Sequence, residues 1–447
     1  MFHTKAYLRN QYECWGRVFR FEHGIEPVFW RDEAPKLESL PGPLLPYGMG
    51  RSYGDVCLNS GGVLLDTSYL NHFLTFDPQT GLLRCEAGVT LFEILDQFVP
   101  EGWFLPVTPG TKYVTVGGAI ANDVHGKNHH VGGTFGCHVK RLELLRSSGE
   151  RFLCSAEENA EMFRATIGGL GLTGLILWAD IQLKKIEGPW IHMETEKFSN
   201  LDEFFGITEA SDEAFELTAA WIDCATQTRG FQRGIVIRGN YGHEGAHKKS
   251  ARAKGPRVAV PFDLPGFCMN RTVLRMFNAV YAGKQRKKRE TGRVHYESFF
   301  YPLDILGNWN RLYGKKGFYQ YQCMVTDDKK HSGCKALMKK VSDRRMDSFL
   351  AVLKKCGPIK SPGLLSFPRE GIAVAMDFPN GGEKLLKFFK ELDAIVQDYD
   401  GCVNLSKDAR MPPESFKVFY PQWENFGKLK DPKFSSSFWR RVTGEAG

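Results

Sequence analysis

Short apolar segments separated by turns fill the first 184 residues of the chain. Strand-like runs cover 63–66, 82–86 and 142–146, and apolar residues recur at helical spacing in 91–98 and 159–165. A strand buries alternate positions, whereas a helix buries every third or fourth. The pattern therefore predicts a mixed α+β region.

After residues 185–189 the pattern changes, and the next part alternates apolar and polar residues in 217–222 and 234–238. Such alternation predicts an antiparallel sheet with one buried face. After an interruption come two more strand-like runs, an amphipathic segment and a helix, at 319–325, 372–378, 335–355 and 382–399. The apolar residues of the helix are expected in the core rather than against a ligand: Leu385, Leu386, Phe388, Phe389, Leu392 and Ile395.

Three glycine-rich stretches lie in the first region. The first is 46–55 (Pro-Tyr-Gly-Met-Gly-Arg-Ser-Tyr-Gly-Asp), and the third is 168–176. In the second, 110–130, an alternating run at 113–116 precedes Gly117 and Gly118. The first two match neither the Rossmann nor the P-loop pattern. Each alone could be an ordinary turn. Because glycine leaves backbone N–H groups accessible, the three together favour a pyrophosphate cradle of another type.

Length and composition indicate a two-domain protein. The chain has 447 residues, of which 42% are hydrophobic and 25% charged, a normal composition for a globular protein. No apolar run reaches the roughly 18 residues of a membrane-spanning helix. Residues 1–19 lack the apolar core of a signal peptide. We therefore expect the protein on the cytoplasmic side, where it could bind the inner membrane peripherally.

The net charge of +8 is concentrated in one stretch. Residues 248–293 hold thirteen Lys and Arg against Asp263 and Glu290, a net of +11, which leaves about −3 for the rest. This basic insertion also contains apolar residues, so an anionic membrane surface is one expectation and a solvated loop the other. No nucleic-acid motif accompanies it, and its aromatic residues are not spaced for base stacking. We expect no nucleic-acid partner.

Cysteine and histidine usage argues against disulfides and metals. The eleven cysteines are scattered without a C-x-x-C pair, as expected of reduced thiols. His125, His129, His130 and His138 cluster, but no Cys, Asp or Glu stands at a zinc-site spacing from them. No metal site is predicted, and His129 and His130 are expected to be structural.

Seven motifs in order carry a family resemblance. They are Gly-Arg-Ser-Tyr-Gly-Asp, Val-Gly-Gly-Ala-Ile-Ala, His-Gly-Lys-Asn-His-His, Gly-Leu-Thr-Gly, Tyr-Pro-Leu-Asp, Gln-Tyr-Gln and the late Lys-Asp. Together they resemble the vanillyl-alcohol oxidase family, and most closely its ribose-oxidising branch. The resemblance implies an α+β fold, with a two-part PCMH-type FAD-binding domain and an inserted antiparallel-sheet substrate domain. The implied division is 1–188 for FAD, 189–401 for substrate with a flexible basic insertion near 245–293, and 402–447 returning to the FAD domain.

The resemblance also implies a set of FAD contacts. Many relatives attach FAD covalently through a histidine in the first glycine loop, but this chain has Tyr53 there, so we expect non-covalent FAD. The implied cofactor residues are Pro46, Tyr47, Gly48, Met49, Gly50, Arg51, Ser52, Tyr53, Gly54, Asp55, Val56, Gly110, Thr115, Val116, Gly117, Gly118, Asn122, Asp123, Val124, His125, Ile176 and Asn404.

A flavin oxidises an alcohol by taking a hydride while a base takes the hydroxyl proton. The resemblance implies Lys407, His125 and Tyr53 as catalytic residues. Lys407 is a base only if its pKa is lowered; otherwise it is a fixed cation, and His125 or water takes the proton. Alternatively, His125 has no catalytic role and makes a hydrogen bond to the backbone.

The implied substrate residues are Lys127, Trp221, Phe300, Gln320, Gln322 and Lys354. The chain departs from its relatives at Phe300, where they carry tyrosine, and at Ala373 and Ala375, where they carry asparagine and cysteine.

The function implied by the resemblance is oxidation of the 2-hydroxyl of a polyprenylphosphoryl pentose. This is the first half of a ribose-to-arabinose epimerisation for cell-envelope glycans, and an NAD(P)H-dependent short-chain reductase completes it. The alternatives are a soluble alditol or sugar-lactone oxidase using O2, and a non-enzymatic adaptor that has kept an inactive flavin fold.

Overall fold

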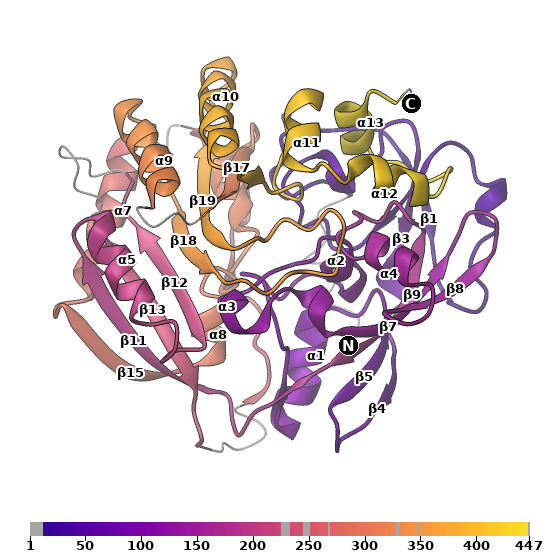
Figure 1. The fold of residues 1–447 in the computed structure, drawn as a ribbon, viewed down its shortest axis with the longest axis horizontal. Coiled ribbons are helices and arrows are strands. Elements are labelled where there is room, and N and C mark those ends of the chain that lie inside the picture. The colour runs from indigo at the N-terminus through magenta and orange to yellow at the C-terminus, as the bar shows by residue number, and fades with distance from the viewer. Residues whose placement is uncertain are drawn as a thin grey trace.

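The structure is a computed structural model that describes residues 12–224, 233–244, 251–266, 269–326, 331–346 and 348–445. We refer to 12–188 as the N-terminal region, 189–403 as the sheet region and 404–445 as the C-terminal segment. Figure 1 shows the sheet region beside the N-terminal region, with the C-terminal helices above the latter.

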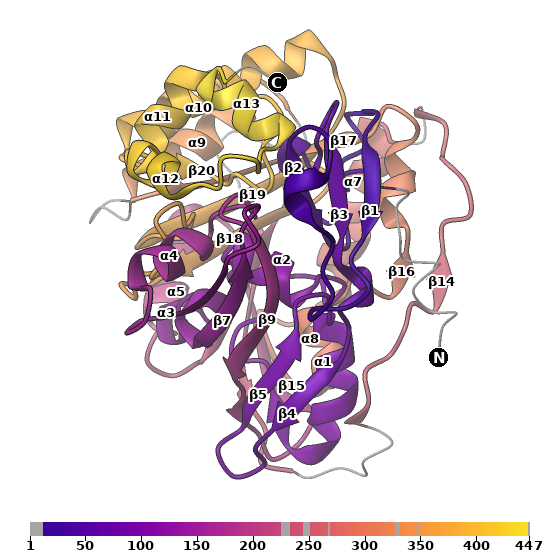
Figure 2. The ribbon, with the colours of Figure 1, turned by 90° about the vertical axis from the view of Figure 1, so that its right-hand side faces the viewer.

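The N-terminal region contains two main sheets, seen side by side in Figure 2. One is parallel, in the order β1–β3–β2, and the other is antiparallel, in the order β4–β5–β9–β7–β8. A short antiparallel pair, β6 with β10, lies beside them. The strands are β1 (Gly24–Pro27), β2 (Leu44–Tyr47), β3 (Val63–Asp66), β4 (Phe73–Phe76), β5 (Leu82–Glu86), β6 (Trp103–Phe104), β7 (Val139–Leu145), β8 (Arg151–Ser155), β9 (Leu175–Gln182) and β10 (Lys184–Lys185). The strands predicted at 63–66 and 82–86 are confirmed.

Helix α1 (Leu91–Phe98) has the bounds that its periodicity predicts. Thr90 and Glu93 form a capping box at its start, which satisfies otherwise unpaired N–H groups. Its apolar positions Leu91, Ile94, Leu95 and Phe98 are buried. The other helices of this region are α2 (Val116–Ala121), α3 (His129–Gly132) and α4 (Ala160–Thr166), with 3-10 turns at Leu37–Ser39, Asp55–Cys57, Thr67–Tyr69, Val99–Glu101 and Phe135–His138.

One antiparallel sheet of eight strands organises the sheet region, in the order β15–β11–β13–β12–β18–β19–β17–β20. Its strands are β11 (Trp190–Phe198), β12 (Leu217–Ile222), β13 (Gly234–Tyr241), β15 (Arg289–His295), β17 (Phe318–Val325), β18 (Ala351–Cys356), β19 (Gly371–Pro379) and β20 (Cys402–Val403). The predicted antiparallel sheet is confirmed, and 217–222 is β12 itself.

Helices cover one face of this sheet. Tyr321 on β17 packs against Phe389 of α10 (Glu383–Asp398), with ring centroids 5.2 Å apart, and donates a hydrogen bond to Asp393. Because side chains alternate along a strand, the neighbouring positions of β17 face the other way, toward the N-terminal region. The remaining helices here are α5 (Leu201–Glu209), α7 (Arg271–Lys284), α8 (Tyr296–Phe300) and α9 (Ser332–Asp343), with a 3-10 turn at Trp309–Tyr313.

Two segments differ from expectation. The amphipathic segment 335–355 is divided, because α9 ends before Arg345, which has a positive φ of 50°, and β18 begins at Ala351. The described part of the basic insertion contains regular elements: α7, the first residues of β15, and β14 (Val258–Ala259), which pairs in parallel with β16 (Leu306–Gly307) beyond the insertion. Residues 245–250 and 267–268, with Lys248, Lys249 and Phe267, lie outside the described residues.

The C-terminal segment ties the two regions together. It leaves the large sheet at β20 and forms α11 (Pro413–Phe419), α12 (Trp423–Leu429) and α13 (Ser437–Thr443). The N–H of Leu44 in β2 donates to Lys433 O at 2.8 Å, and Arg441 forms an ion pair with Asp55. A continuous apolar core joins Leu45 and Tyr47 to the helices α10 and α13. Among the described residues, no helix has the length and apolarity to cross a bilayer.

Candidate functional site

The first glycine loop presents unused backbone donors. The N–H groups of Gly48, Met49 and Gly50 donate no hydrogen bond within the described parts of the chain. A Cβ on Gly48 would lie 2.5 Å from Thr115 Oγ1. One on Gly50, whose φ is +61°, would lie 2.1 Å from Tyr47 Oη. Glycine is therefore required at both positions, and the free N–H groups can donate hydrogen bonds to an anion.

The same loop is held against the C-terminal segment. The N–H of Tyr53 donates to Ser406 O at 2.9 Å, and a Cβ on Gly54 would lie 1.7 Å from Asp408 O. Arg441 joins Asp55 and Asp408, with its Nη2 2.7 Å from Asp55 Oδ1 and 3.0 Å from Asp408 Oδ2. These contacts fix Lys407 beside the loop.

The second glycine stretch is used differently from expectation. The run 113–116 is not a strand, because Thr115 caps helix α2 and accepts from Gly118 N. The N–H groups of Val116 and Gly117 donate to Val89 O and Ala87 O at 2.8 and 2.7 Å. The N–H groups of Val116, Gly117 and Gly118 are therefore already used within the protein and cannot bind a cofactor.

Asn122 and Asp123 follow α2 and have distinct roles. Asn122 donates to Gly118 O at 2.8 Å, and its Oδ1 is buried without a hydrogen-bond partner among the described residues. The carboxylate of Asp123 accepts from Gly136 N and from the hydroxyls of Ser361 and Ser366. Asp123 thus holds the loop between β18 and β19, and its side chain is not available to a cofactor.

Other predicted cofactor residues are buried apolar side chains, a glycine beside open space, or a link between the glycine loops. Val56, Val116 and Ile176 are buried apolar side chains, and a Cβ on Gly110 would meet open space. Arg51 lies 4.1 Å from the Trp15 ring centroid and donates to Tyr113 O at 3.2 Å, which connects the two glycine loops. The free N–H groups and the orphaned Asn122 acceptor fit a flavin dinucleotide.

Lys407 and Tyr53 are in direct contact. The Lys407 Nζ lies 4.0 Å from the centroid of the Tyr53 ring, and no hydrogen bond or ion pair from this ammonium reaches another described residue. Burial lowers the pKa of Lys407 to about 8; the charge of Asp377 opposes this shift and that of Lys354 adds to it. Lys407 is therefore partly neutral near physiological pH.

His125 is the end of a buried hydrogen-bond chain. Gln322 Nε2 donates to His125 Nε2 at 3.1 Å, and Asn404 Nδ2 donates to Gln322 Oε1 at 3.2 Å. Burial lowers the pKa of His125 well below its usual value, and Lys354, His129 and Lys407 add to this. A neutral ring that accepts at Nε2 carries its proton on Nδ1, which is buried without a partner in the described ranges. Among the described residues, this ring makes no hydrogen bond to the backbone.

Strand register gathers the other polar residues on one face. Gln322 pairs with Ala375 and Gln320 with Asp377 across β17 and β19, while Lys354 of β18 pairs with Ala373. Because positions two apart share a face, these six side chains point the same way. Trp221, paired with Val352, lies on this face as well.

Lys354 is the centre of a cluster of basic side chains, the others being Lys127, His125, His129 and Lys407. Burial lowers the pKa values of Lys354 itself, of Lys127, to about 7, and of His129, to about 4. The charge of Lys354 is the next cause for both Lys127 and His129, and it also lowers the pKa values of His125 and Lys407. The Lys354 ammonium makes no hydrogen bond or ion pair within the described parts of the chain. This excess of positive charge fits an anionic ligand.

Phe300 and Trp221, two of the predicted substrate residues, pack mainly against other aromatic side chains. The Phe300 ring is 3% exposed and packs on Phe104 and Phe299, at centroid distances of 5.3 and 5.2 Å. It therefore belongs to the aromatic core, and its contribution is its carbonyl, which with that of Phe299 accepts from Lys127 Nζ. Trp221 packs against Tyr281 of α7, with centroids 4.8 Å apart.

Sequence reasoning missed Asp377 and the role of His129. Asp377 is fully buried, accepts from Gln320 Nε2 at 2.6 Å, and its Oδ2 has no partner among the described residues. Burial raises its pKa to about 7, against the effects of Gln320 and Lys407. Asp377 follows Ala373 and Ala375 at strand spacing and so shares their face of β19. His129, expected to be structural, has two buried ring nitrogens without partners in the described ranges and belongs to the cluster.

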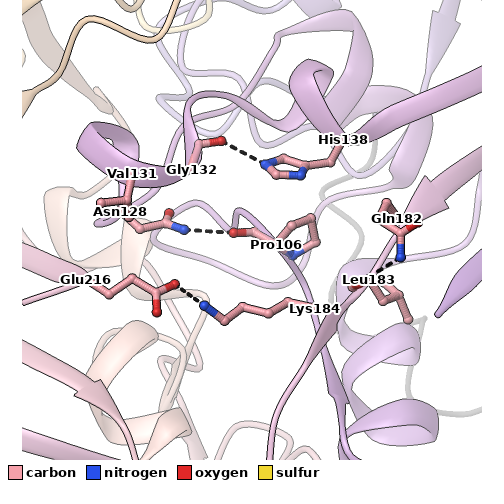
Figure 3. A pocket seen from close by; sticks show the side chains of 9 residues that line it. All are labelled: Pro106, Asn128, Val131, Gly132, His138, Gln182, Leu183, Lys184 and Glu216. Atoms are coloured by element: carbon pink, nitrogen blue, oxygen red, sulfur yellow. Dashed lines mark hydrogen bonds and ion pairs between the residues drawn. The ribbon is translucent and has the colours of Figure 1, made fainter. Parts of the chain in front are cut away.

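A separate cavity of about 440 Å³ lies between the two regions (Figure 3). It is lined by Asn128, Val131 and His138 on one side and by the Lys184–Glu216 ion pair on the other. None of the predicted site residues lines it. Across the described ranges, no group of three or more His, Cys, Asp or Glu side chains could hold a metal ion.

Comparison with known proteins agrees with this geometry. A family model described as an FAD binding domain matches residues 39–155, which include the first two glycine stretches. Decaprenylphosphoryl-beta-D-ribose oxidase of Mycolicibacterium smegmatis is 34% identical over 408 residues, covering 88% of each chain. An uncharacterized protein of Streptomyces coelicolor is 30% identical over 375 residues, covering 79% of this chain and 100% of that protein.

A more distant match covers about a third of the chain. L-gulonolactone oxidase of Bos taurus is 29% identical over 153 residues, 34% of this chain and 33% of that enzyme. The chain is thus an FAD-binding oxidoreductase acting on alcohol or lactone groups, and it belongs to the PCMH-type, or vanillyl-alcohol oxidase, family.

Proposed function

We propose that this enzyme oxidises the 2-hydroxyl of a polyprenylphosphoryl pentose to a ketone. The observation that carries the proposal is the buried ammonium of Lys354, which shares a sheet face with Gln320 and Gln322 and has no hydrogen-bond or ion-pair partner in the described ranges. Lys127, His125, His129 and Lys407 all feel the charge of Lys354, and Asp377 is the carboxylate that acts on Lys407. A phosphate group would give the Lys354 ammonium an anionic partner, whereas a neutral polyol would leave this buried cation unpaired.

The cofactor would be held by the first glycine loop and by Asn122. The free N–H groups of Gly48, Met49 and Gly50 suit its pyrophosphate, and the buried Oδ1 of Asn122 suits a donor on the ring system. When bound, FAD supplies the acceptor for the hydride that leaves the substrate carbon.

The proton of the substrate hydroxyl would go to Lys407. Its lowered pKa leaves a fraction of the amine neutral near pH 7, and such an amine can accept a proton. His125 is less suited to this task, since its Nε2 already accepts from Gln322 and its Nδ1 carries the proton. We assign His125 the role of donor, with Gln320 and Gln322 orienting the sugar.

We further propose that FAD is bound non-covalently. The residue after Gly-Arg-Ser is Tyr53, whose ring is enclosed between Phe318 and Lys407. Burial raises the pKa of its phenol well above the usual value, so this group is not a nucleophile.

The proposed product needs a second enzyme. A 2-keto pentose becomes the epimeric alcohol when a hydride is delivered to the other face, and an NAD(P)H-dependent short-chain reductase would do this. The similarity to a decaprenylphosphoryl-ribose oxidase supports such a place in cell-envelope glycan synthesis.

A sugar-lactone oxidase is the second candidate, favoured by the partial similarity to L-gulonolactone oxidase. It differs from the first in needing no phosphate. Replacing Lys354 would therefore weaken only the first reaction.

The decisive experiment is anaerobic flavin reduction by polyprenylphosphoryl pentoses, free pentoses, alditols and sugar lactones. We expect reduction by the phosphate compounds, with kcat/KM lowered about 100-fold in Lys354→Met, since a charge-assisted contact to phosphate is lost. Lys355→Met is the matched control, because Lys355 points to the other face and pairs with Asp212 at 2.6 Å. Reduction by lactones alone, or equal loss in both variants, would exclude the proposal.

A further inference from the structure

Helix α7 lies at the left-hand edge of the molecule in Figure 1 and has one face turned inward. Leu274 and Asn278 are buried, and Asn278 Nδ2 donates to Asp223 Oδ1 at 2.7 Å. Tyr281, one turn further, packs on Trp221. This face therefore covers the end of β12 that carries the predicted substrate residue Trp221.

The start of α7 lies near Tyr53. Met269, two residues before the helix, packs against the cluster of Trp15, Tyr53, Tyr313 and Phe318. The helix thus runs from the surroundings of Tyr53 to Trp221. Its C-terminal part therefore packs on the predicted substrate residue Trp221.

A second apolar face of α7 points outward. Val273, Met276, Phe277 and Val280 recur at spacings of three and four, so they share one side of the helix. Their exposed fractions are 42%, 65%, 54% and 64%. Four large apolar side chains exposed together on one helix mark an interaction surface. We refer to these four residues as the outer face of α7.

Basic residues follow directly after the outer face. Lys284, Arg286, Lys287 and Lys288 are exposed. None of these four forms an ion pair with a residue in the described ranges. A helix with an apolar face and adjoining cations is typical of helices that lie in the surface of an anionic bilayer. A protein partner would need an acidic rim around an apolar groove, whereas anionic lipid supplies both chemistries at once.

We infer that α7 docks the enzyme on an anionic lipid bilayer, with its outer face among the acyl chains and its inner face over the substrate pocket. This inference rests on the proposed lipid-phosphate substrate. The polyprenyl chain then stays in the bilayer while its phosphate reaches the cluster around Lys354. No transfer of the lipid through water is needed.

The test measures binding of the full-length holoenzyme to phosphatidylcholine vesicles with and without phosphatidylglycerol. The test variant is Met276→Ser/Phe277→Ser/Val280→Ser. The control is Phe29→Ser/Val418→Ser, which removes apolar side chains of similar exposure, 52% each, elsewhere on the surface.

We expect the wild type and the control to bind the phosphatidylglycerol vesicles, and the test variant to bind about 100-fold more weakly. Lys287→Glu/Lys288→Glu should bind more weakly and lose the salt dependence of the wild type. Flavin content, melting temperature and turnover of a short-chain pentosyl phosphate should stay unchanged in the test variant, which shows that it is folded.

Several outcomes would overturn the inference. One is equal vesicle binding by the test variant and the wild type, and another is wild-type protein that ignores both vesicles. If the outer face is instead required for coupled turnover with a soluble reductase, it is a protein interface and the inference is wrong. The proposed function has its own readout, since a protein that binds vesicles but oxidises no pentosyl phosphate refutes the function and leaves the docking intact.

Discussion

The ammonium of Lys407 lies 4.0 Å from the centroid of the Tyr53 ring, so the C-terminal segment places a cation on the first glycine loop. The backbone makes the same connection, since Tyr53 N donates to Ser406 O. The proposed base and the proposed flavin site are therefore positioned together by contacts between distant parts of the chain.

The pH dependence of flavin reduction should identify the role of Lys407. Its pKa is lowered to about 8, so the amine becomes neutral as the pH rises through this value. If it is the base, the reduction rate measured by stopped flow rises with pH and levels off above about pH 8. A rate that falls above pH 8 would show that the ammonium is needed instead. Lys407→Met should lower the rate about 1,000-fold in the first case.

Asp377→Asn should shift this profile. The carboxylate of Asp377 raises the pKa of Lys407, so its removal lowers that pKa further. We expect the midpoint of the profile to move to lower pH by about one unit, the usual effect of a nearby opposite charge. Asp398→Asn, at the exposed end of α10, is the control and should leave the midpoint in place. An unchanged midpoint in Asp377→Asn would show that the carboxylate has no such effect.

Binding of a phosphate-bearing substrate should be accompanied by proton uptake. The pKa of Lys127 is lowered to about 7 and that of Lys407 to about 8, so both are partly neutral near pH 7.5. A bound anion favours the charged forms and raises both pKa values. Titration calorimetry in buffers of different ionisation enthalpy should detect this uptake with a pentosyl phosphate and much less with the free pentose. Equal proton uptake with both ligands would show that the phosphate does not bind at the basic cluster around Lys354.

The flavin should be released when the protein is denatured. Because Tyr53 stands where relatives carry a flavin-linked histidine, acid precipitation should leave a yellow supernatant and a colourless pellet. Tyr53→Phe should give the same result and keep the flavin spectrum of the folded enzyme. A flavin that stays with the pellet would show that another residue forms a covalent link.

Gly54→Ala should weaken flavin binding. Its Cβ would lie 1.7 Å from Asp408 O, a backbone atom, so the loop or the C-terminal segment has to move. We expect a loss of about 3 kcal/mol in stability, in the range of overpacked sites, and at least partial loss of bound flavin. Gly206→Ala, on α5 with nothing within 4 Å of the added Cβ, should instead stabilise the fold by up to about 1 kcal/mol. Melting curves and flavin absorbance measure both effects.

Local signals in the sequence are sufficient where an element is defined by its own residues. Helix α1 has a capping box and four buried residues at helical spacing, and β12 has the bounds that its sequence pattern predicts. Other features depend on contacts with residues that are distant in the sequence, and these could not be predicted locally. Gly117 uses its N–H on Ala87, thirty positions earlier, and the Phe300 ring is drawn into an aromatic core around Phe104.

The site itself was partly predictable. Motif order brought together His125, Gln322 and Asn404, which form one hydrogen-bond chain. Asp377 was overlooked because an acidic residue in an apolar strand has no chemical meaning until the neighbouring strands are known. Its pairing with Gln320 comes from the register of β17 and β19.

The hydroxyls of Ser361 and Ser366 both donate to Asp123, two residues before His125. The loop they belong to connects the strand of Lys354 to the strand of Asp377. A chimera that exchanges the sheet region with that of another family member would therefore need the complementary serine and aspartate pair on either side of the junction. Without these residues, we expect both regions of the chimera to fold, but the proposed substrate residues of the sheet region would be misplaced relative to the N-terminal region.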